Sequence, residues 1–290
     1  MKKSGIFGVT ALVLVVVAGS AGYIWFENRN KATLIDVKWA AHSPDSTTEV
    51  NHDPWQALLD DYLVTDEEDP DIHLFDYSGL VDDGREPLDE YIAMLEAVDP
   101  SQLNINEQKA YWFNVYNAVT VSLIVNNFPV ESITQLGSGG VSSFGPWDDK
   151  LFNIDGDTLS LNEIEHGIIR PLYDDFRIHF AVNCASIGCP DLAVEAFRGD
   201  NLEEQLNAAT ESYLQHPRGL RFEGDQLHLS TLFEWYGSDF GADFKSMLNT
   251  FGKYTTEDVS AQLADYNGEP EYFYDWSLNG YCAVDNSCGG

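Results

Sequence analysis

The spacing of apolar residues predicts a chain built mainly from helices. From Pro54 to Leu63 and from Pro87 to Val98 the apolar side chains recur three and four residues apart, as in amphipathic helices. The longest helix is expected from Ile105 to Phe128, with Asn104 or Asn106 as its N-cap and Pro129 just beyond its end. Further helical patterns cover residues 160–170, 201–214, 232–240 and 244–251, the first opening on a capping box and stopped by Pro171.

Alternating patterns around tight turns predict the β-structure. Leu151 to Leu159 is expected to form a hairpin at Asp155-Gly156, and Arg221 to Ser230 a second one at Gly224-Asp225. Arg177 to Val182 is a short β-branched and aromatic run, which is typical of a buried strand. We therefore predict an α+β fold, with helices packed around a small, mainly antiparallel sheet.

The N-terminus predicts export. Lys2 and Lys3 precede Gly5 to Phe26, a run without charge that is long enough to span a membrane with its N-terminus in the cytoplasm. A cleaved signal peptide is the alternative, because Ala18 to Ala21 offers small residues near a cleavage point. The length favours an uncleaved anchor in the inner membrane, with the body in the periplasm or outside the cell. The expected organisation is 1–26 anchor or signal, 27–53 linker, 54–260 globular domain and 261–290 an acidic aromatic tail.

The charge of the chain excludes two classes of binding partner. The 290 residues include 48 acidic and 15 basic ones, a formal net charge of −33. Such a field repels nucleic acid and anionic membrane surfaces, so both are excluded as ligands of the body. An acidic surface also stays soluble in high salt, which indicates a marine or halophilic source, although it can equally be a general solubility feature.

The segment RIHFAVNCASIGCPDL, residues 177–192, carries the candidate chemistry. Cys184 follows the predicted strand and is the candidate nucleophile, with His179 or His166 as its base and Glu165 or Asn117 as the group that orients the base. His179 and Cys184 are five apart and would face opposite sides of an unbroken strand. They can meet only if the chain turns near Asn183.

Polar residues on the helices extend this candidate site. Glu163, His166 and Arg170 share one helical stripe, from which Glu165 points away. A solvated face is the ordinary interpretation, but basic residues are rare in this chain. Arg170 and Arg177 are candidate anchors for a small-molecule or peptide ligand. We assign Asn114 and Asn183 to ligand binding as well, although the helical asparagines can instead hold neighbouring backbone.

Cysteine spacing leaves alternatives open. In an exported protein Cys184 and Cys189 can form a disulfide, as can Cys282 and Cys288 in the tail. The spacing C-x4-C differs from the C-x-x-C of a redox pair, and neither pair has zinc-ligand spacing. We expect no metal and no cofactor. The rival to a thiol hydrolase or acyltransferase is a membrane-tethered binding or scaffolding domain, whose buried Asn, His and Arg form a structural polar network.

Several separated motifs resemble one family, the domain of unknown function 547. They are AYWFNVYNAVTVSLIVNNFP, FGPW, LSLNEIEHGIIRP, RIHFAVNCASIGCPDL and LFEWYGSDF, in that order within residues 95–250. The family has no assigned activity. Its pattern includes the equivalents of Asn117, His166, Arg170, His179 and Cys184, all of which match here. Cys189 is a looser part of the pattern, and this weighs against an obligatory 184–189 disulfide.

A helix with small residues followed by a strand that carries His is also similar to the core of the papain and transglutaminase superfamily. In that superfamily the nucleophilic Cys begins the helix. Here Asn117-Ala118 stands in that place and the Cys follows the His, so the nucleophile does not transfer by position.

Overall fold

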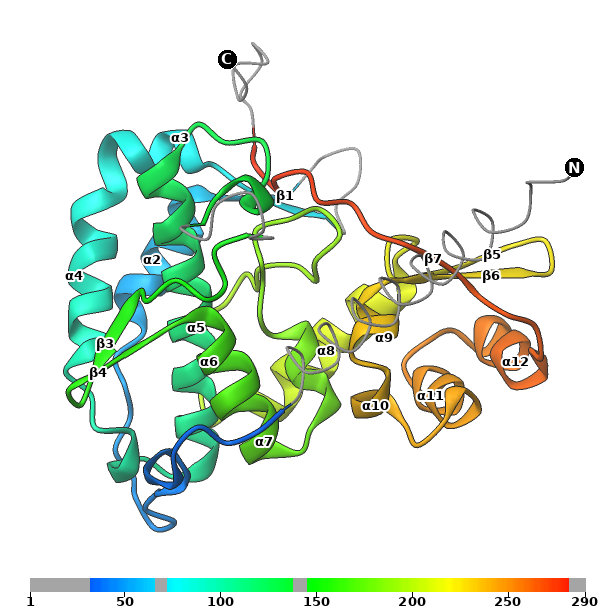
Figure 1. Cartoon of the computed structure of the whole chain (residues 1–290), viewed down its shortest axis with the longest axis horizontal. Helices are drawn as coiled ribbons and strands as arrows, with labels where there is room; N and C mark the ends of the chain where they lie inside the picture. The colour runs from blue at the N-terminus through cyan, green and yellow to red at the C-terminus, as the bar shows by residue number, and fades with distance from the viewer. Residues whose placement is uncertain (1–31, 66–71, 138–144, 282–290) are drawn as a thin grey trace, which may run out of the picture.

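The computed structural model describes residues 32–65, 72–137 and 145–281 (Figure 1). The predicted anchor Gly5 to Phe26, both tail cysteines and most of the Gly/Ser loop before Trp147 lie outside these ranges. Within them, none of the helices has the length and apolar character that crossing a membrane requires.

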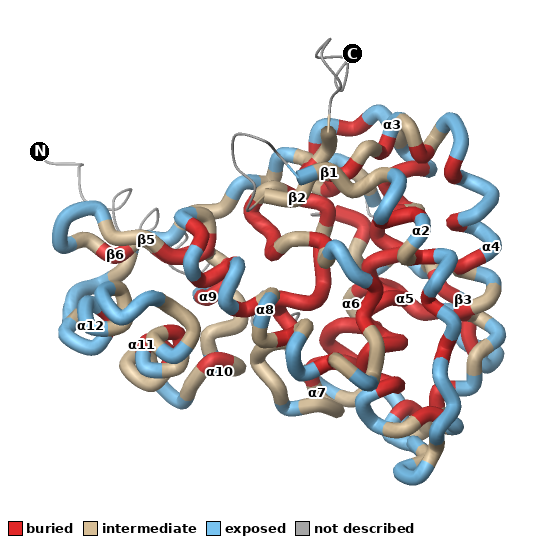
Figure 2. The backbone as a smooth tube through the Cα atoms, turned by 180° about the vertical axis from the view of Figure 1, so that it is seen from behind, coloured by how far each residue is buried: buried red, intermediate tan, exposed pale blue. Residues whose placement is uncertain are grey.

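Helix α5 (Ile105–Asn127) is the centre of the larger part of the molecule. The side chain of Asn104 caps it by accepting hydrogen bonds from the backbone N–H groups of Asn106 and Glu107. Of its 23 residues 18 are buried, because neighbours cover it on nearly every side (Figure 2). A helix that is apolar all round belongs in a core. The elements around it include α2 (Asp53–Tyr62), α3 (Tyr77–Gly79), α4 (Arg85–Glu96) and short turns at Leu80–Gly84, Pro100–Gln102 and Ile133–Gln135.

The β-structure lies in three small sheets. Strands β1 (Leu63–Thr65) and β2 (His73–Phe75) pair antiparallel, as do β3 (Phe152–Ile154) and β4 (Asp157–Leu159). Strands β5 (Leu220–Glu223) and β6 (Gln226–Ser230) form the second predicted hairpin, and β7 (Glu271–Phe273) joins β6 in parallel. Both predicted hairpins and the α+β class are confirmed.

Two hydrophobic clusters build the interior. The larger surrounds α5. The smaller contains Phe233, Phe240 and Phe251 and draws on α8 (Leu202–Gln215), β5, β6, α9 (Leu232–Trp235), α10 (Gly237–Phe240), α11 (Phe244–Phe251) and α12 (Glu257–Asp265). Phe180 packs in the smaller cluster while its neighbour Ala181 packs in the larger. The segment with His179 therefore lies where the two clusters meet.

The predicted strand 177–182 is wrong. Phe176–Phe180 is a 3-10 helix, η7, whose N-terminus is capped by the Asp175 side chain through the N–H of Arg177. A short apolar run fits a buried helical turn as well as a strand, and periodicity alone does not separate them. The His-bearing strand on which the likeness to the papain and transglutaminase core depended is therefore replaced by a helical turn.

The predicted helix 160–170 has a different course. It consists of α6 (Leu161–Ile164), a π-turn η6 (Glu165–Ile169) and α7 (Arg170–Tyr173). Pro171 does not stop it, because it sits in the first turn of α7, where a proline is tolerated. The N–H of Arg170 donates to the Glu165 carbonyl, five residues back. The wider turn places Glu165, not Glu163, with His166 and Arg170. Glu163 instead pairs with Lys150 near the surface.

Both ends of the described chain pack on this framework. Trp39, in the 3-10 turn η1 (Val37–Ala40) of the expected linker, is buried edge-on against Trp112 of α5, with ring centroids 5.5 Å apart. After β7 the tail crosses the molecule from the smaller cluster to the larger (Figure 1, red). The Ser277 carbonyl accepts from Ile187 N–H, and the Asn279 carbonyl accepts from Phe75 N–H.

Candidate functional site

Two asparagines shape the loop that carries Cys184. Asn117 of α5 donates from Nδ2 to the Ala181 carbonyl (2.9 Å) and accepts at Oδ1 from the Asn183 N–H (2.9 Å). The Asn183 side chain then spans the loop, donating to the Pro190 carbonyl and accepting from the Ala185 N–H. These bonds satisfy buried amides and fix the turn after η7.

The loop holds one strained residue. Ala185 has a φ of 57°, in the left-handed region that non-glycine residues rarely occupy. Beyond it the tail lies so close to Gly188 that a Cβ there would stand 2.8 Å from the Asp275 backbone nitrogen. Strain that persists between well-fixed neighbours clusters at functional sites, and it draws attention to the adjacent cysteine.

The Cys184 sulfur lies among polar hydrogen-bonding groups. Its Sγ is 2.7 Å from Cys189 Sγ, 3.2 Å from the Tyr274 hydroxyl and 3.3 Å from Ser186 Oγ. The Cys184 N–H donates to Cys189 Sγ at 3.0 Å. Cys184 is partly exposed, whereas Cys189 is buried, and both are free thiols.

The two thiols differ in acidity. Hydrogen bonding from Cys189 lowers the pKa of Cys184, burial opposes this, and Ser186 and Tyr274 lower it further. Burial raises the pKa of Cys189 well above its usual value, and the neighbouring Cys184 raises it again. The thiolate is therefore favoured on the more accessible sulfur, which is the arrangement that a nucleophile needs.

A charged network lies at the junction of the two clusters. Arg170 holds Asp239 of α10 through two hydrogen bonds, Nε to Oδ2 at 2.7 Å and Nη2 to Oδ1 at 2.9 Å. His179 Nε2 is 2.8 Å from the same carboxylate, and its ring stacks on Tyr236 with centroids 4.5 Å apart. The hydrogen bonds of His179 and Arg170 hold the pKa of Asp239 well below its usual range despite its burial.

Glu165 is the unusual acid of this network. Its Oε1 lies 3.7 Å from His166 Nδ1 and 3.9 Å from His179 Nδ1, and only 7% of the residue is exposed. Burial raises its pKa to about 7, although Arg170 and a hydrogen bond from Tyr116 work in the opposite direction. Burial also lowers the pKa of His179. Perturbed acids and bases of this kind gather at functional sites.

The charged network and the thiols influence each other through space. The Glu165 charge raises the pKa of Cys184. Both ring nitrogens of His179 face carboxylates, so the sulfur finds its hydrogen-bonding neighbours in Ser186, Cys189 and Tyr274. The structure thus brings Glu165, His166, Arg170 and His179 together as one group, and Asn117, Asn183 and Cys184 as another beside it.

The other two predicted ligand-binding residues serve elsewhere. Arg177 forms a two-point ion pair with Asp175, which also binds Lys109. Burial raises the pKa of Asp175, but these contacts outweigh it and lower the pKa to about 2. Asn114 exchanges two hydrogen bonds with the Phe197 backbone, from Nδ2 to the carbonyl and from the N–H to Oδ1. Both residues fasten loops to the framework.

Sequence reasoning missed four contributors to the site. Ser186 stands in the central motif two residues after Cys184, but nothing in the pattern singles it out. Tyr236 and Asp239 belong to LFEWYGSDF, whose polar residues among aromatic ones are the signal that points to them. Tyr274 lies 90 residues from Cys184 in an acidic tail. No local pattern connects it with the thiol.

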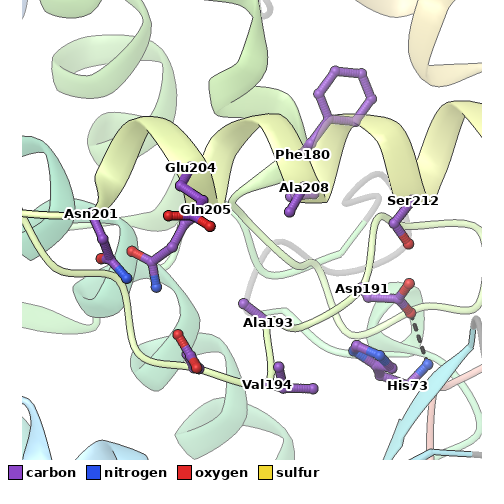
Figure 3. A pocket seen from close by; sticks show the side chains of 12 residues that line it. His73, Phe180, Asp191, Ala193, Val194, Asn201, Glu204, Gln205, Ala208 and Ser212 are labelled. Atoms are coloured by element: carbon purple, nitrogen blue, oxygen red, sulfur yellow. Dashed lines mark hydrogen bonds between the residues drawn. The ribbon is translucent and has the colours of Figure 1, made fainter. Parts of the chain in front are cut away.

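A separate cavity of about 540 Å³ lies between α8 and the loop after Pro190 (Figure 3). Phe180, Ala193, Val194 and Ala208 form its apolar part, and Asp191, held to His73 by a hydrogen bond, closes one end. None of the residues predicted for catalysis or ligand binding lines it. Among residues 32–65, 72–137 and 145–281, no group of three or more His, Cys, Asp or Glu is placed to hold a metal ion.

Comparisons with known proteins identify only a family. No curated protein and no solved structure matches the chain. Residues 100–214 match the family described as a protein of unknown function, DUF547. The matched region includes α5, the π-turn, η7 and both thiols, whereas Asp239 and Tyr274 come from beyond it. The resemblance to this family that the separated motifs predict is therefore confirmed over residues 100–214.

Proposed function

We propose that this protein is a cysteine-dependent hydrolase or acyltransferase in which Cys184 is the nucleophile. The observation that carries the proposal is the environment of its sulfur, which is partly exposed and surrounded by the Ser186 and Tyr274 hydroxyls and the Cys189 thiol. These groups favour the thiolate, the form that attacks an acyl carbon.

Glu165 and the two histidines supply the proton acceptor in this proposal. A group with a pKa of about 7 both takes up and returns a proton near neutral pH, which is what general acid–base catalysis requires. Arg170 and Asp239 fix the position of His179 beside Glu165. They act as positioning residues. The ligand is an uncharged or cationic small molecule or peptide, because the strongly acidic surface repels anions.

An acyl-transfer test examines the nucleophile directly. The full chain, reduced and kept in detergent, is mixed with p-nitrophenyl acetate near neutral pH. We expect a burst of p-nitrophenol and an acetyl group on Cys184, located by mass spectrometry, and no burst from Cys184→Ser. Cys189→Ser is the matched control and should keep the acetyl group on Cys184. Acetylation of Cys184 only after denaturation would end the proposal.

A non-catalytic binding or scaffolding role is the second candidate. The observation that favours it is the close internal pairing of Arg170, His179 and Asp239, which is also how a structural polar network satisfies itself. Iodoacetamide labelling against pH separates the two functions. Labelling of Cys184 well below the usual thiol pKa of about 8.5 supports catalysis, whereas protection until unfolding supports the structural role.

We also propose that Gly5 to Phe26 tethers the body to the inner membrane and leaves it on the outer side. The uncharged run after Lys2 and Lys3 supports this orientation. Expression in a bacterial host followed by alkaline carbonate washing tests it. The chain should remain in the membrane pellet and be degraded when protease is added to spheroplasts. Release of a shortened chain into the periplasm would show cleavage instead.

A further inference from the structure

The two thiols of the Cys184 loop are arranged for more than one reaction. Their sulfur atoms are 2.7 Å apart, and a disulfide bond of about 2.05 Å requires only a small further approach. The backbone already brings them together. Cys184 N–H donates to Cys189 Sγ, and Cys189 N–H donates to the Ser186 carbonyl, closing the turn between them. The C-x4-C spacing, which differs from that of common redox pairs, is therefore no obstacle to pairing.

Accessibility gives the two sulfurs different roles. Cys184 is partly exposed, whereas Cys189 is 4% exposed and packs beneath it. A reagent from solvent meets Cys184 first. Cys189 then lies within reach of whatever forms on Cys184. Burial and the neighbouring Cys184 raise the pKa of Cys189, so Cys184 reacts first, and that first step removes the Cys184 part of the effect.

We propose that Cys184 and Cys189 form a thiol–disulfide exchange site, with Cys184 as the attacking thiol, Cys189 as the resolving thiol and a small-molecule disulfide as the co-reactant. This inference shares the Cys184 nucleophile with the proposed function and adds a second activity at the same sulfur. The export predicted from the N-terminus would bring the site into contact with such disulfides.

The exchange balances in two steps. The Cys184 thiolate attacks one sulfur of RS–SR, forms the mixed disulfide Cys184–S–SR and expels RS⁻, which takes up a proton. Cys189 then loses its proton and attacks the Cys184 sulfur, and the second RS⁻ leaves and is protonated. In total, two protein thiols are oxidised to one disulfide and RS–SR is reduced to two RSH.

The redox state of Cys184 and Cys189 also determines whether the proposed acyl transfer can take place. In the disulfide form Cys184 has no thiolate, so the nucleophile is absent until a reductant restores it. Ser186 and Tyr274 remain at hydrogen-bonding distance from the sulfur in the reduced state and favour its reactive form. Oxidation would thus switch off acyl transfer reversibly.

The test follows the products of exchange with oxidised glutathione in about 1 M NaCl, because this salt screens the repulsion between the anionic disulfide and the acidic surface. The full chain in detergent carries Cys282→Ser and Cys288→Ser, so that only the pair reacts, and is reduced and desalted before mixing. We expect two molecules of glutathione released per chain and a 184–189 disulfide peptide. When Cys189→Ser is introduced into this background, the chain should release one molecule of glutathione and retain a glutathione adduct on Cys184. When Cys184→Ser is introduced into this background instead, the chain should react with oxidised glutathione at least roughly tenfold more slowly, because the remaining thiol is buried.

The outcomes separate this inference from the proposed function. A stable glutathione adduct on Cys184 with Cys189 present, and only one glutathione released, would overturn the exchange site while leaving Cys184 as a nucleophile. Absence of any reaction in the folded chain would overturn it as well. The acetyl burst on Cys184, measured on the same reduced sample, reports on acyl transfer independently. Glu90→Gln, on the exposed side of α4, keeps both thiols and their neighbours and should still release two molecules.

Discussion

At the scale of single residues, Glu165 gives the molecule a pH dependence with a definite sign. Its pKa rises from the usual 4.5 to about 7 on folding, so the folded state holds the proton more tightly than the unfolded chain. Its contribution to stability is complete below pH 4.5 and is lost as the pH rises through 7. His179, whose pKa is lowered by burial, acts in the opposite direction over part of this range. The comparison must therefore be made between variants.

Glu165→Gln should remove the Glu165 contribution while keeping a hydrogen-bond acceptor for Tyr116. We expect the free energy of unfolding of the variant, relative to the unsubstituted chain, to increase by roughly 2.5 kcal/mol between pH 5 and pH 8. Urea unfolding at both values measures it. Glu90→Gln on the exposed side of α4 is the control and should show the same difference at both pH values. If the stability difference between Glu165→Gln and the unsubstituted chain is the same at pH 5 and pH 8, the pKa of Glu165 is not raised.

Tyr274 is the residue of the tail that acts on the thiol. Burial keeps its pKa well above 10, so the hydroxyl remains a donor for the Cys184 sulfur. Tyr274→Phe removes this donor and should raise the pH midpoint of Cys184 alkylation by about one unit, since a hydrogen bond to a charged group contributes about 1.5–3 kcal/mol. Tyr272→Phe, two residues away on β7, should leave the midpoint in place. An unchanged midpoint for Tyr274→Phe would assign the low pKa to Cys189 and Ser186 alone.

At the scale of elements, α5 fixes two loops through two equivalent asparagines. Asn117 binds the backbone on both sides of Val182, and Asn114 binds Phe197 in the same manner. Each alanine substitution leaves buried backbone groups unpaired, and we expect each to reduce the free energy of unfolding by about 2–4 kcal/mol. Only Asn117→Ala should also change the rate of Cys184 alkylation, because it releases the Cys184 loop. Chemical denaturation and alkylation of the pair Asn117→Ala and Asn114→Ala measure both effects. If Asn114→Ala changes the rate of Cys184 alkylation as much as Asn117→Ala does, the rate reports a loss of stability of the whole fold and not the release of the Cys184 loop.

The elements that the sequence predicts well are those stabilised by local interactions. Helix α5 has an Asn104 cap and a proline after its end, and both hairpins turn at residue pairs suited to positive φ, so α5 and the hairpins lie close to where the pattern puts them. The π-turn at Glu165–Ile169 is different. Its extra residue depends on packing around Glu165 and Arg170, and an α-helical spacing rule therefore selected Glu163 as their neighbour instead.

The sequence predicts the candidate site only in part. Cys184, His179 and Asn117 carry chemistry in their own motifs, so residue type alone selected them. Their geometry is set by long-range contacts, with Asp239 60 residues beyond His179 and Tyr274 90 residues beyond Cys184. Such contacts leave no periodic signal in the chain. The sequence therefore predicts the reactive groups better than it predicts which of them touch.

At the scale of the whole molecule, the tail joins the two hydrophobic clusters across the site. It pairs with β6 of the smaller cluster, contacts the Cys184 loop through Gly188 and Ile187, and ends beside β2 of the larger one. Trp276 of the tail packs against both Trp235 and Trp147, with ring centroids 5.5 Å and 5.7 Å apart. The position of Tyr274 at the thiol is thus a consequence of how the two parts are held together.

The net charge of −33 acts on the same framework as a repulsive field. The screening length shortens from about 10 Å at 0.1 M salt to about 3 Å at 1 M, so added salt removes most repulsion between exposed carboxylates. The internal ion pairs of Arg170 and Arg177 are largely buried and are screened much less. The folded state should therefore gain stability as NaCl is raised. We expect the melting temperature to rise by about 2–8 °C over this range, the shift that 1–2 kcal/mol produces in a domain of this size. Sucrose at matched osmolality is the control for general exclusion effects and should produce a smaller rise. A melting temperature that stays constant or falls in NaCl would mean that the acidic residues are already neutralised locally, and that the field of the whole chain does not limit its stability.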